Sequence, residues 1–223
     1  MLVRDAMTPH PITISPQMTL PEIDKIFREH RIRRAPVMDN GRLVGIISDH
    51  DLMANLPSPA TTLSRWEVNA LLDKLQARDF MTHPVYVIAP DCPLEEVARV
   101  MNEKKFGAMP VMEGDQLVGI VTESDIFRTF VSMLSGGDVP GLRFELRAER
   151  QTGVVAETAR LVNEHGGRVI TLVTVNEADG LHKRLLVKEE GANAEALRQA
   201  LAASDIEVLD IRQRRQCSVF AVG

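Results

Sequence analysis

Two short stretches carry the side chains of this sequence that are best placed to bind a ligand. In each, an apolar run is followed by a hydroxyl residue and, three positions later, by an aspartate: Ser48 with Asp51, and Thr122 with Asp125. A hydroxyl residue with an acid at the third position is the pattern of a helix N-terminal capping box, and the acid also complements the helix dipole. A carboxylate in the first helical turn can equally accept hydrogen bonds from the two adjacent hydroxyls of a ribose, and a helix N-terminus favours a phosphate. The two roles are compatible.

These stretches are matching parts of an internal repeat. The segment from Val3 to Met53 recurs without a gap as Ala77 to Phe127, at an offset of 74 residues, and 17 of the 51 pairs are identical. Such a period predicts two copies of one supersecondary unit. Each copy is expected to run strand, helix, strand, strand, helix, after a proline-rich opening that stays extended or turning. The strands are expected at 12–14, 35–38 and 43–47 in the first copy, and the second copy begins with a strand at 85–88.

The remaining segments divide by composition. Residues 56–76 connect the repeats (1–55 and 77–134) and contain an expected helix at 66–75, and residues 135–141 are a linker rich in Gly, Ser and Pro. Residues 142–213 alternate as strand, helix, strand, strand, helix, strand, which is the order of a ferredoxin-like sandwich. The tail at 214–223 has no assignment. The expected fold class is α/β, with an α+β C-terminal domain.

Bulk composition narrows the classes of function. A net charge of −5 gives no field that would draw the whole chain to nucleic acid, and no apolar stretch approaches the ~20 residues of a membrane helix. The first residues lack the apolar core of a signal peptide, and two cysteines, Cys92 and Cys217, predict reduced thiols in a cytoplasm. Phosphate-loop, hydrolase-elbow and metalloprotease motifs are absent, and the histidines lack metal-ligand spacing. We expect no catalytic residue, no metal, no nucleic-acid partner and no membrane partner.

The repeats resemble a tandem pair of CBS (cystathionine β-synthase) domains. Each copy opens Asp-x-Met-Thr and ends Gly-apolar-apolar-Ser/Thr-x-x-Asp, and the resemblance covers residue 3 to about residue 130. It implies an α/β disc with two clefts that take AMP, ATP or S-adenosylmethionine as a regulatory ligand rather than a cofactor. By position, the resemblance implies that Asp51 and Asp125 hold ribose, helped by Ser48 and Thr122. It implies that the Asp51 cleft is closed by Thr82 and the backbone of Phe106, Gly107 and Ala108. It implies that the Asp125 cleft is closed by Thr8 and the backbone of Ile32, Arg33 and Arg34.

The resemblance also implies an inequality between the clefts. CBS domains often place basic residues just before the second strand, where phosphates lie. The first repeat has Arg33 and Arg34 there, whereas the second has Gly107 and Ala108. We therefore expect the Asp51 cleft to be the better phosphate site; alternatively, the two arginines form a solvated basic surface.

Residues 142–213 resemble an ACT domain, by their element order and by the Gly153 turn between the first strand and the first helix. That resemblance implies an amino-acid ligand at Gly153, often at a dimer interface; alternatively, glycine is simply what the turn requires. The whole arrangement is similar to the acetoin-utilisation regulatory family, which implies a cytoplasmic homodimer that regulates an unidentified protein. Two other functions stay open: a dimerisation adaptor with degenerate clefts, and an enzyme that uses a bound nucleotide.

Overall fold

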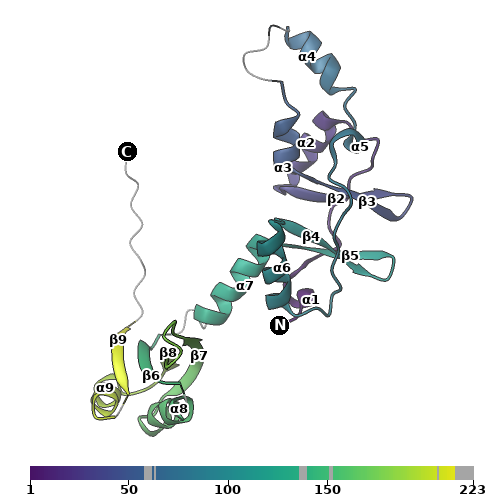
Figure 1. The fold of residues 1–223 in the computed structure, drawn as a ribbon. Coiled ribbons are helices and arrows are strands. Elements are labelled where there is room, and N and C mark those ends of the chain that lie inside the picture. The colour runs from purple at the N-terminus through teal and green to yellow at the C-terminus, as the bar shows by residue number, and fades with distance from the viewer. Residues whose placement is uncertain (58–61, 63, 136–139, 151–152, 205, 214–223) are drawn as a thin grey trace. The chain divides into compact units, whose positions relative to one another are not determined.

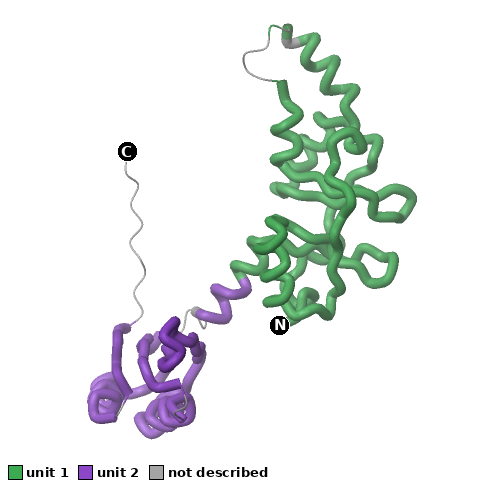
Figure 2. The backbone as a smooth tube through the Cα atoms, in the orientation of Figure 1, with its two compact units in different colours: residues 1–128 green, residues 129–223 purple. Residues whose placement is uncertain are grey.

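The computed structural model describes residues 1–57, 62, 64–135, 140–150, 153–204 and 206–213. The chain splits into two compact units, residues 1–128 and 129–223 (Figure 2). This division falls inside one helix, α7 (Glu123–Ser135), several residues before the predicted linker. Residues 136–139 of that linker and the tail, with Cys217, lie outside the described residues. Among the residues that are described, no helix has the length and apolar character needed to cross a membrane.

The first unit is built from the two repeats (Figure 1). The predicted hairpins, the predicted central helices and the helix that follows each hairpin are all confirmed, as is a helix between the repeats. The first repeat contains α1 (Val3–Ala6), β1 (Thr8–Pro9), α2 (Leu20–His30), β2 (Arg34–Asp39), β3 (Arg42–Ser48) and α3 (Asp49–Ala54). After the connecting helix α4 (Arg65–Leu72), the second repeat contains α5 (Ala77–Phe80), α6 (Leu94–Lys104), β4 (Ala108–Glu113), β5 (Gln116–Thr122) and α7.

The predicted opening strands are wrong. Residues 12–14 and 85–88 each form only a single bridge, Ile14 with Val37 and Ile88 with Val111. Prolines on both sides of each bridge lack the N–H group that a longer ladder needs. Two short helices that the sequence did not predict, α1 and α5, begin the openings. Each is held by an acid that accepts from the backbone N–H group three residues earlier, Asp5 in α1 and Asp79 in α5, both at 2.9 Å.

Each opening segment pairs with the hairpin of the other repeat. Thr8 lies opposite Ile120 in the sheet β1–β5–β4, and Thr82 forms a bridge with Ile46 of β3. The methionine before each threonine packs on a glycine of that same strand: a Cβ on Gly119 or Gly45 would clash with the sulfur of the packed methionine. The repeated Met-Thr and Gly positions therefore form the contact that exchanges the two openings.

The second unit confirms the predicted element order. It contains β6 (Leu142–Glu149), α8 (Val154–Glu164), β7 (Arg168–Asn176), β8 (His182–Glu190), α9 (Ala194–Ala202) and β9 (Glu207–Gln213). The strands form one antiparallel sheet in the order β7–β8–β6–β9, which is the ferredoxin-like topology. Both helices pack on it around a buried apolar core that includes Phe144, Val162 and Leu197. Alternate residues of β6 are buried, as the alternating sequence predicts.

Candidate functional site

Both hydroxyl–aspartate pairs form capping boxes. Ser48 begins α3, where its backbone N–H and its Oγ–H both donate to Asp51 Oδ2, at 2.8 and 2.7 Å. Asp51 returns a hydrogen bond from its own backbone N–H to Ser48 Oγ at 3.3 Å. Asp51 and Ser48 are half-buried. The capping role uses one oxygen of the carboxylate, Oδ2.

The second pair repeats this geometry at the start of α7. Thr122 donates to Asp125 Oδ2 from its N–H at 3.0 Å and from its Oγ1–H at 2.6 Å. Asp125 is buried, with 6% of its surface exposed, which is uncommon for an aspartate. Its other oxygen, Oδ1, accepts from Arg128 Nη1 at 3.2 Å. Both aspartates thus form the cap. Among the described residues, Asp125 accepts a hydrogen bond from an arginine of its own helix, whereas Asp51 does not.

Asp125 lies in a cavity of about 270 Å³. That volume is near the lower end of small-molecule sites, which span roughly 300–1,000 Å³. Four arginines line the cavity against the one aspartate, so its charge favours an anion. The lining residues are Thr8, His10, Pro11, Ile12, Arg31, Ile32, Arg33, Arg34, Ile120, Thr122, Ser124, Asp125 and Arg128.

The structure brings together every residue predicted for the Asp125 cleft. Thr8 reaches it through the exchanged pairing of β1 with β5. Ile32 and Arg33 reach it from the loop that leads into β2, and Arg34 from the first position of β2. Arg33 donates from Nη2 to Ser124 Oγ, in the first turn of α7, at 3.2 Å. Binding of nucleotide by these residues stays a prediction.

The predicted inequality of the clefts depends on Arg33 and Arg34. Both residues line the cavity of Asp125. The expectation of a phosphate site assigns the two arginines to the Asp51 cleft, whereas the expected position of their backbone assigns them to the Asp125 cleft. The fold agrees with the second assignment, because the segment before β2 faces α7 of the other repeat. The alternative, a solvated basic surface, agrees with the exposure of Arg33, whose guanidinium donates to Ser124 Oγ in an exposed hydrogen bond. Arg34 in addition extends toward Gly107, where a Cβ would clash with its guanidinium.

The residues predicted for the Asp51 cleft are joined less closely by the measured contacts. Thr82 and Ile46 exchange two backbone hydrogen bonds, of 2.9 and 3.1 Å, which places Thr82 two residues from Ser48 along β3. The ring of Phe106 packs on Tyr86, and Gly107 and Ala108 contact α7 and β5 of their own repeat. A cleft that joins these residues to Asp51 stays a prediction.

Sequence reasoning missed seven residues of the cavity. Four of the seven are polar, and these are His10, Arg31, Ser124 and Arg128. Arg128 had a readable signal, because a residue three positions after Asp125 lies on the same face of a helix. Arg31 and His10 both lie in the left-handed region of backbone conformation, which sequence does not reveal for these residue types.

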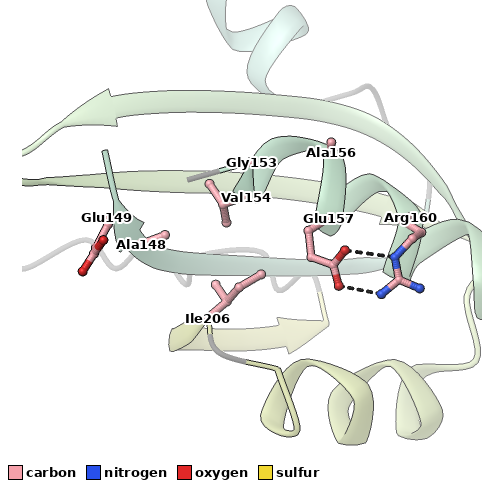
Figure 3. Close-up of a pocket in the computed structure, with 8 residues that line it drawn as sticks. All are labelled: Ala148, Glu149, Gly153, Val154, Ala156, Glu157, Arg160 and Ile206. Atoms are coloured by element: carbon pink, nitrogen blue, oxygen red, sulfur yellow. Dashed lines mark hydrogen bonds and ion pairs between the residues drawn. The ribbon is translucent and has the colours of Figure 1, made fainter. Parts of the chain in front are cut away.

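A second cavity, of about 660 Å³, lies in the ferredoxin-like unit (Figure 3). It is formed between the end of β6 and the start of α8, and it includes Gly153, which caps α8 with a φ of −71°. A Cβ on Gly153 would meet nothing within 4 Å, so the turn itself does not require glycine, contrary to the simpler alternative. Glu157 and Arg160 form an ion pair there, which lowers the pKa of Glu157 and raises that of Arg160. The cavity is therefore lined by apolar side chains together with one arginine, Arg160, which is paired with Glu157.

The described residues also bring three potential metal ligands together, contrary to the spacing-based expectation. Ligand atoms of Glu177, Asp179 and His182 all lie within 4.8 Å of one another. Arginine side chains already neutralise both carboxylates: Arg147 contacts Glu177 and Asp179, and Arg184 contacts Glu177. Hydrogen bonds from His182 lower the pKa of Asp179. The group is therefore accounted for as an ion-pair network.

Comparison with known proteins gives the first unit a family. The CBS domain family matches residues 3–58 and 77–132. The Methanocaldococcus jannaschii protein MJ1426 is 32% identical over 157 residues, covering 59% of this chain and 92% of that protein. The Arabidopsis thaliana chloroplast protein CBSX2 is 31% identical over 147 residues, covering 56% of this chain and 62% of CBSX2. The chain spans 35% of a longer M. jannaschii protein, MJ1232.

Solved structures are similar to the first unit. A protein assigned to acetoin utilization (AcuB) from Vibrio cholerae is 32% identical, with a TM-score of 0.50 over 60% of this chain and 95% of that one. CBSX2 in complex with AMP is 30% identical, with a TM-score of 0.49 over 59% of this chain and 97% of that one.

Proposed function

The chain belongs to the CBS domain family, and on that premise we propose that it is a non-enzymatic regulatory protein that senses an adenine nucleotide. The observation that carries the proposal is the cavity of Asp125. There a buried carboxylate that can accept from ribose hydroxyls lies among four arginines that can hold phosphate. Asp125 lies in the first turn of α7, where Arg33 donates to Ser124, and the dipole of this helix also favours an anion.

The charge of the cavity favours a phosphate-bearing nucleotide. AMP and ATP complement the four arginines, whereas the sulfonium of S-adenosylmethionine adds a positive charge among them. AMP, which was crystallised with the relative CBSX2, is the first ligand to test. We place the stronger site at Asp125 and a weaker one at Asp51, with Ser48, Thr82 and the backbone of residues 106–108.

Signal transmission would use α7. Asp125 is in its first turn, and the same helix continues to Ser135, past the division between the units. A ligand that binds one arrangement of this helix better than another shifts the equilibrium between them. The partner that reads this change is an unidentified regulated protein.

A second ligand site belongs to the ferredoxin-like unit, which we propose to be an ACT domain that binds an amino acid at Gly153. The cavity beside Gly153 supports this, because the residue leaves open space where a side chain would otherwise stand. The N-terminus of α8 has no side-chain cap, so its N–H groups could meet a carboxylate.

We further propose a cytoplasmic homodimer, as in the acetoin-utilisation regulatory family that the chain resembles. Met53 and Phe127 occupy equivalent positions of the two repeats, and their side chains are 70% and 71% exposed. Large apolar side chains repeated on a pseudo-symmetric surface favour an isologous contact with a second copy.

Binding measurements separate these functions. Isothermal titration with AMP, ATP and S-adenosylmethionine is expected to give heat with the phosphate-bearing ligands, and Asp125→Asn is expected to lose more affinity than Asp51→Asn. A ligand at 100 times its Kd should also stabilise the protein by about 2.7 kcal/mol. No binding and no thermal shift with any of them would favour the dimerisation adaptor, and turnover of a nucleotide would favour the enzyme.

A further inference from the structure

Arg128 distinguishes the two aspartates more sharply than any other neighbour. It follows Asp125 by three residues in α7, whereas the equivalent position of the first repeat, 74 residues earlier, is Ala54. Its guanidinium contacts the Oδ1 atom of Asp125, the oxygen that the capping box does not use. Both residues line the same cavity. The repeat thus supplies the cap twice and the arginine once.

The contact joins a buried carboxylate that is held in place to an exposed guanidinium that can move. The Asp125 side chain is 8% exposed and held by Thr122, while the Arg128 side chain is 75% exposed. An exposed guanidinium on a long side chain is held weakly and can change partners. Asp125 Oδ1, by contrast, has nowhere to move, so a ribose that donates to it must share or displace Arg128.

We infer that Arg128 is the specificity-determining residue of the Asp125 cleft: on binding of a nucleotide, its guanidinium exchanges the Asp125 carboxylate for the ligand's phosphate. This inference rests on the proposed function. The ribose hydroxyls take Oδ1, and the released guanidinium joins Arg33 on the phosphate at the first turn of α7. A nucleoside without phosphate must also displace Arg128, but it offers the guanidinium no new anion. The cleft therefore selects nucleotides over nucleosides through an exchange of partners.

Arg33 is the second arginine at this turn of α7. Its Nη2 donates to Ser124 Oγ, while Arg128 donates to the next residue, Asp125. Arg33 has no carboxylate partner in the measured contacts of the described residues, and it is available to phosphate without losing an ion pair. Loss of each arginine is therefore expected to have a different effect. Loss of Arg33 weakens phosphate binding alone, whereas loss of Arg128 weakens phosphate binding and also frees Asp125 for ribose.

The test is isothermal titration of AMP and of adenosine, at low ionic strength because exposed charges are screened by salt. Arg128→Ala is compared with the wild type, with Arg128→Lys, and with Arg28→Ala as a control. Arg28 is an exposed arginine outside the cavity, paired with Asp24, so its removal makes the same change in net charge.

The expected result is a fall of about tenfold or more in the preference for AMP over adenosine in Arg128→Ala, the size of a lost charge-assisted hydrogen bond. Adenosine affinity stays constant or rises, Arg128→Lys retains most of the preference, and Arg28→Ala matches the wild type. Equal losses for both ligands in Arg128→Ala, or an unchanged ratio, would overturn the inference and leave the proposed function standing. Absence of AMP binding to the wild type would overturn the proposed function itself, and this inference with it.

Discussion

Replacement of Thr122 by valine removes the capping hydroxyl but keeps the Asp125 carboxylate, so it distinguishes the structural role of the motif from its proposed role in binding. The valine keeps the shape of threonine and the backbone N–H that donates to Asp125 Oδ2 at 3.0 Å. It removes the hydroxyl, which donates to the same oxygen at 2.6 Å and accepts from the Asp125 N–H at 3.3 Å. Asp125 itself stays in place, so the variant tests the structural role of the motif without removing the residue proposed to bind ribose.

The magnitude follows from those two contacts. Loss of a capping hydroxyl costs about 1 kcal/mol, within a range of roughly 0.5–2. The carboxylate is buried and charged, which raises the cost of losing a partner, but it keeps the Thr122 N–H and Arg128. Valine at the end of β5 recovers a few tenths of a kcal/mol in strand propensity. We expect a net loss of about 1.5 kcal/mol in the unfolding free energy, or roughly 6 °C in the Tm of a unit of this size.

Differential scanning calorimetry measures this shift in the transition of the first unit. The matched control is Thr122→Ser, which keeps the hydroxyl and is expected to stay within about 2 °C of the wild type. Ser48→Ala tests the equivalent cap of the first repeat, where the aspartate is only half-buried, and a smaller loss is expected. The reasoning would be refuted if valine and serine at position 122 lowered the Tm equally, or if neither lowered it.

Three further predictions follow from the packing and the charges. Phe127→Glu places a charge on an exposed apolar site, so light scattering is expected to report a monomer with little change in Tm; a dimer of unchanged affinity would exclude this surface from the interface. Hydrogen bonds from His182 lower the pKa of Asp179. The stability that Asp179 contributes is therefore present above the unfolded pKa of about 4 and is lost as pH falls through the lower folded pKa. The difference in urea midpoint between the wild type and Asp179→Asn should shrink on acidification, and a difference independent of pH would contradict this. Glu189 is 1% exposed and accepts from two backbone N–H groups, at 2.7 and 2.9 Å. Glu189→Gln keeps only one acceptor oxygen, so the unfolding free energy of the second unit should fall by about 2 kcal/mol, measured as a lower urea midpoint. An unchanged midpoint would show that the two N–H groups find other partners.

Local patterns were sufficient for most of the helices and strands. The hairpin β2–β3 turns at Asn40 and Gly41, both with positive φ, as the Asp-Asn-Gly sequence predicts. Helix α8 ends at Glu164, because its amphipathic run is followed by Gly166, which is left-handed. The strands predicted at 12–14 and 85–88 are reduced to single bridges, because the prolines beside them lack the N–H groups that a longer ladder needs. The helices α1 and α5 were missed because four residues carry almost no periodicity.

The sequence by itself determined the two capping boxes and the repeat that carries them, since each box closes over three residues and needs nothing from the rest of the chain. Only the tertiary structure decided which arginines accompany which aspartate. Arg33 and Ser124 are 91 residues apart, and they meet because the opening segments exchange partners between repeats, Thr8 with β5 and Thr82 with β3. A capping hydrogen bond depends on local backbone geometry, whereas the walls of a cleft depend on long-range strand pairing that no local pattern contains.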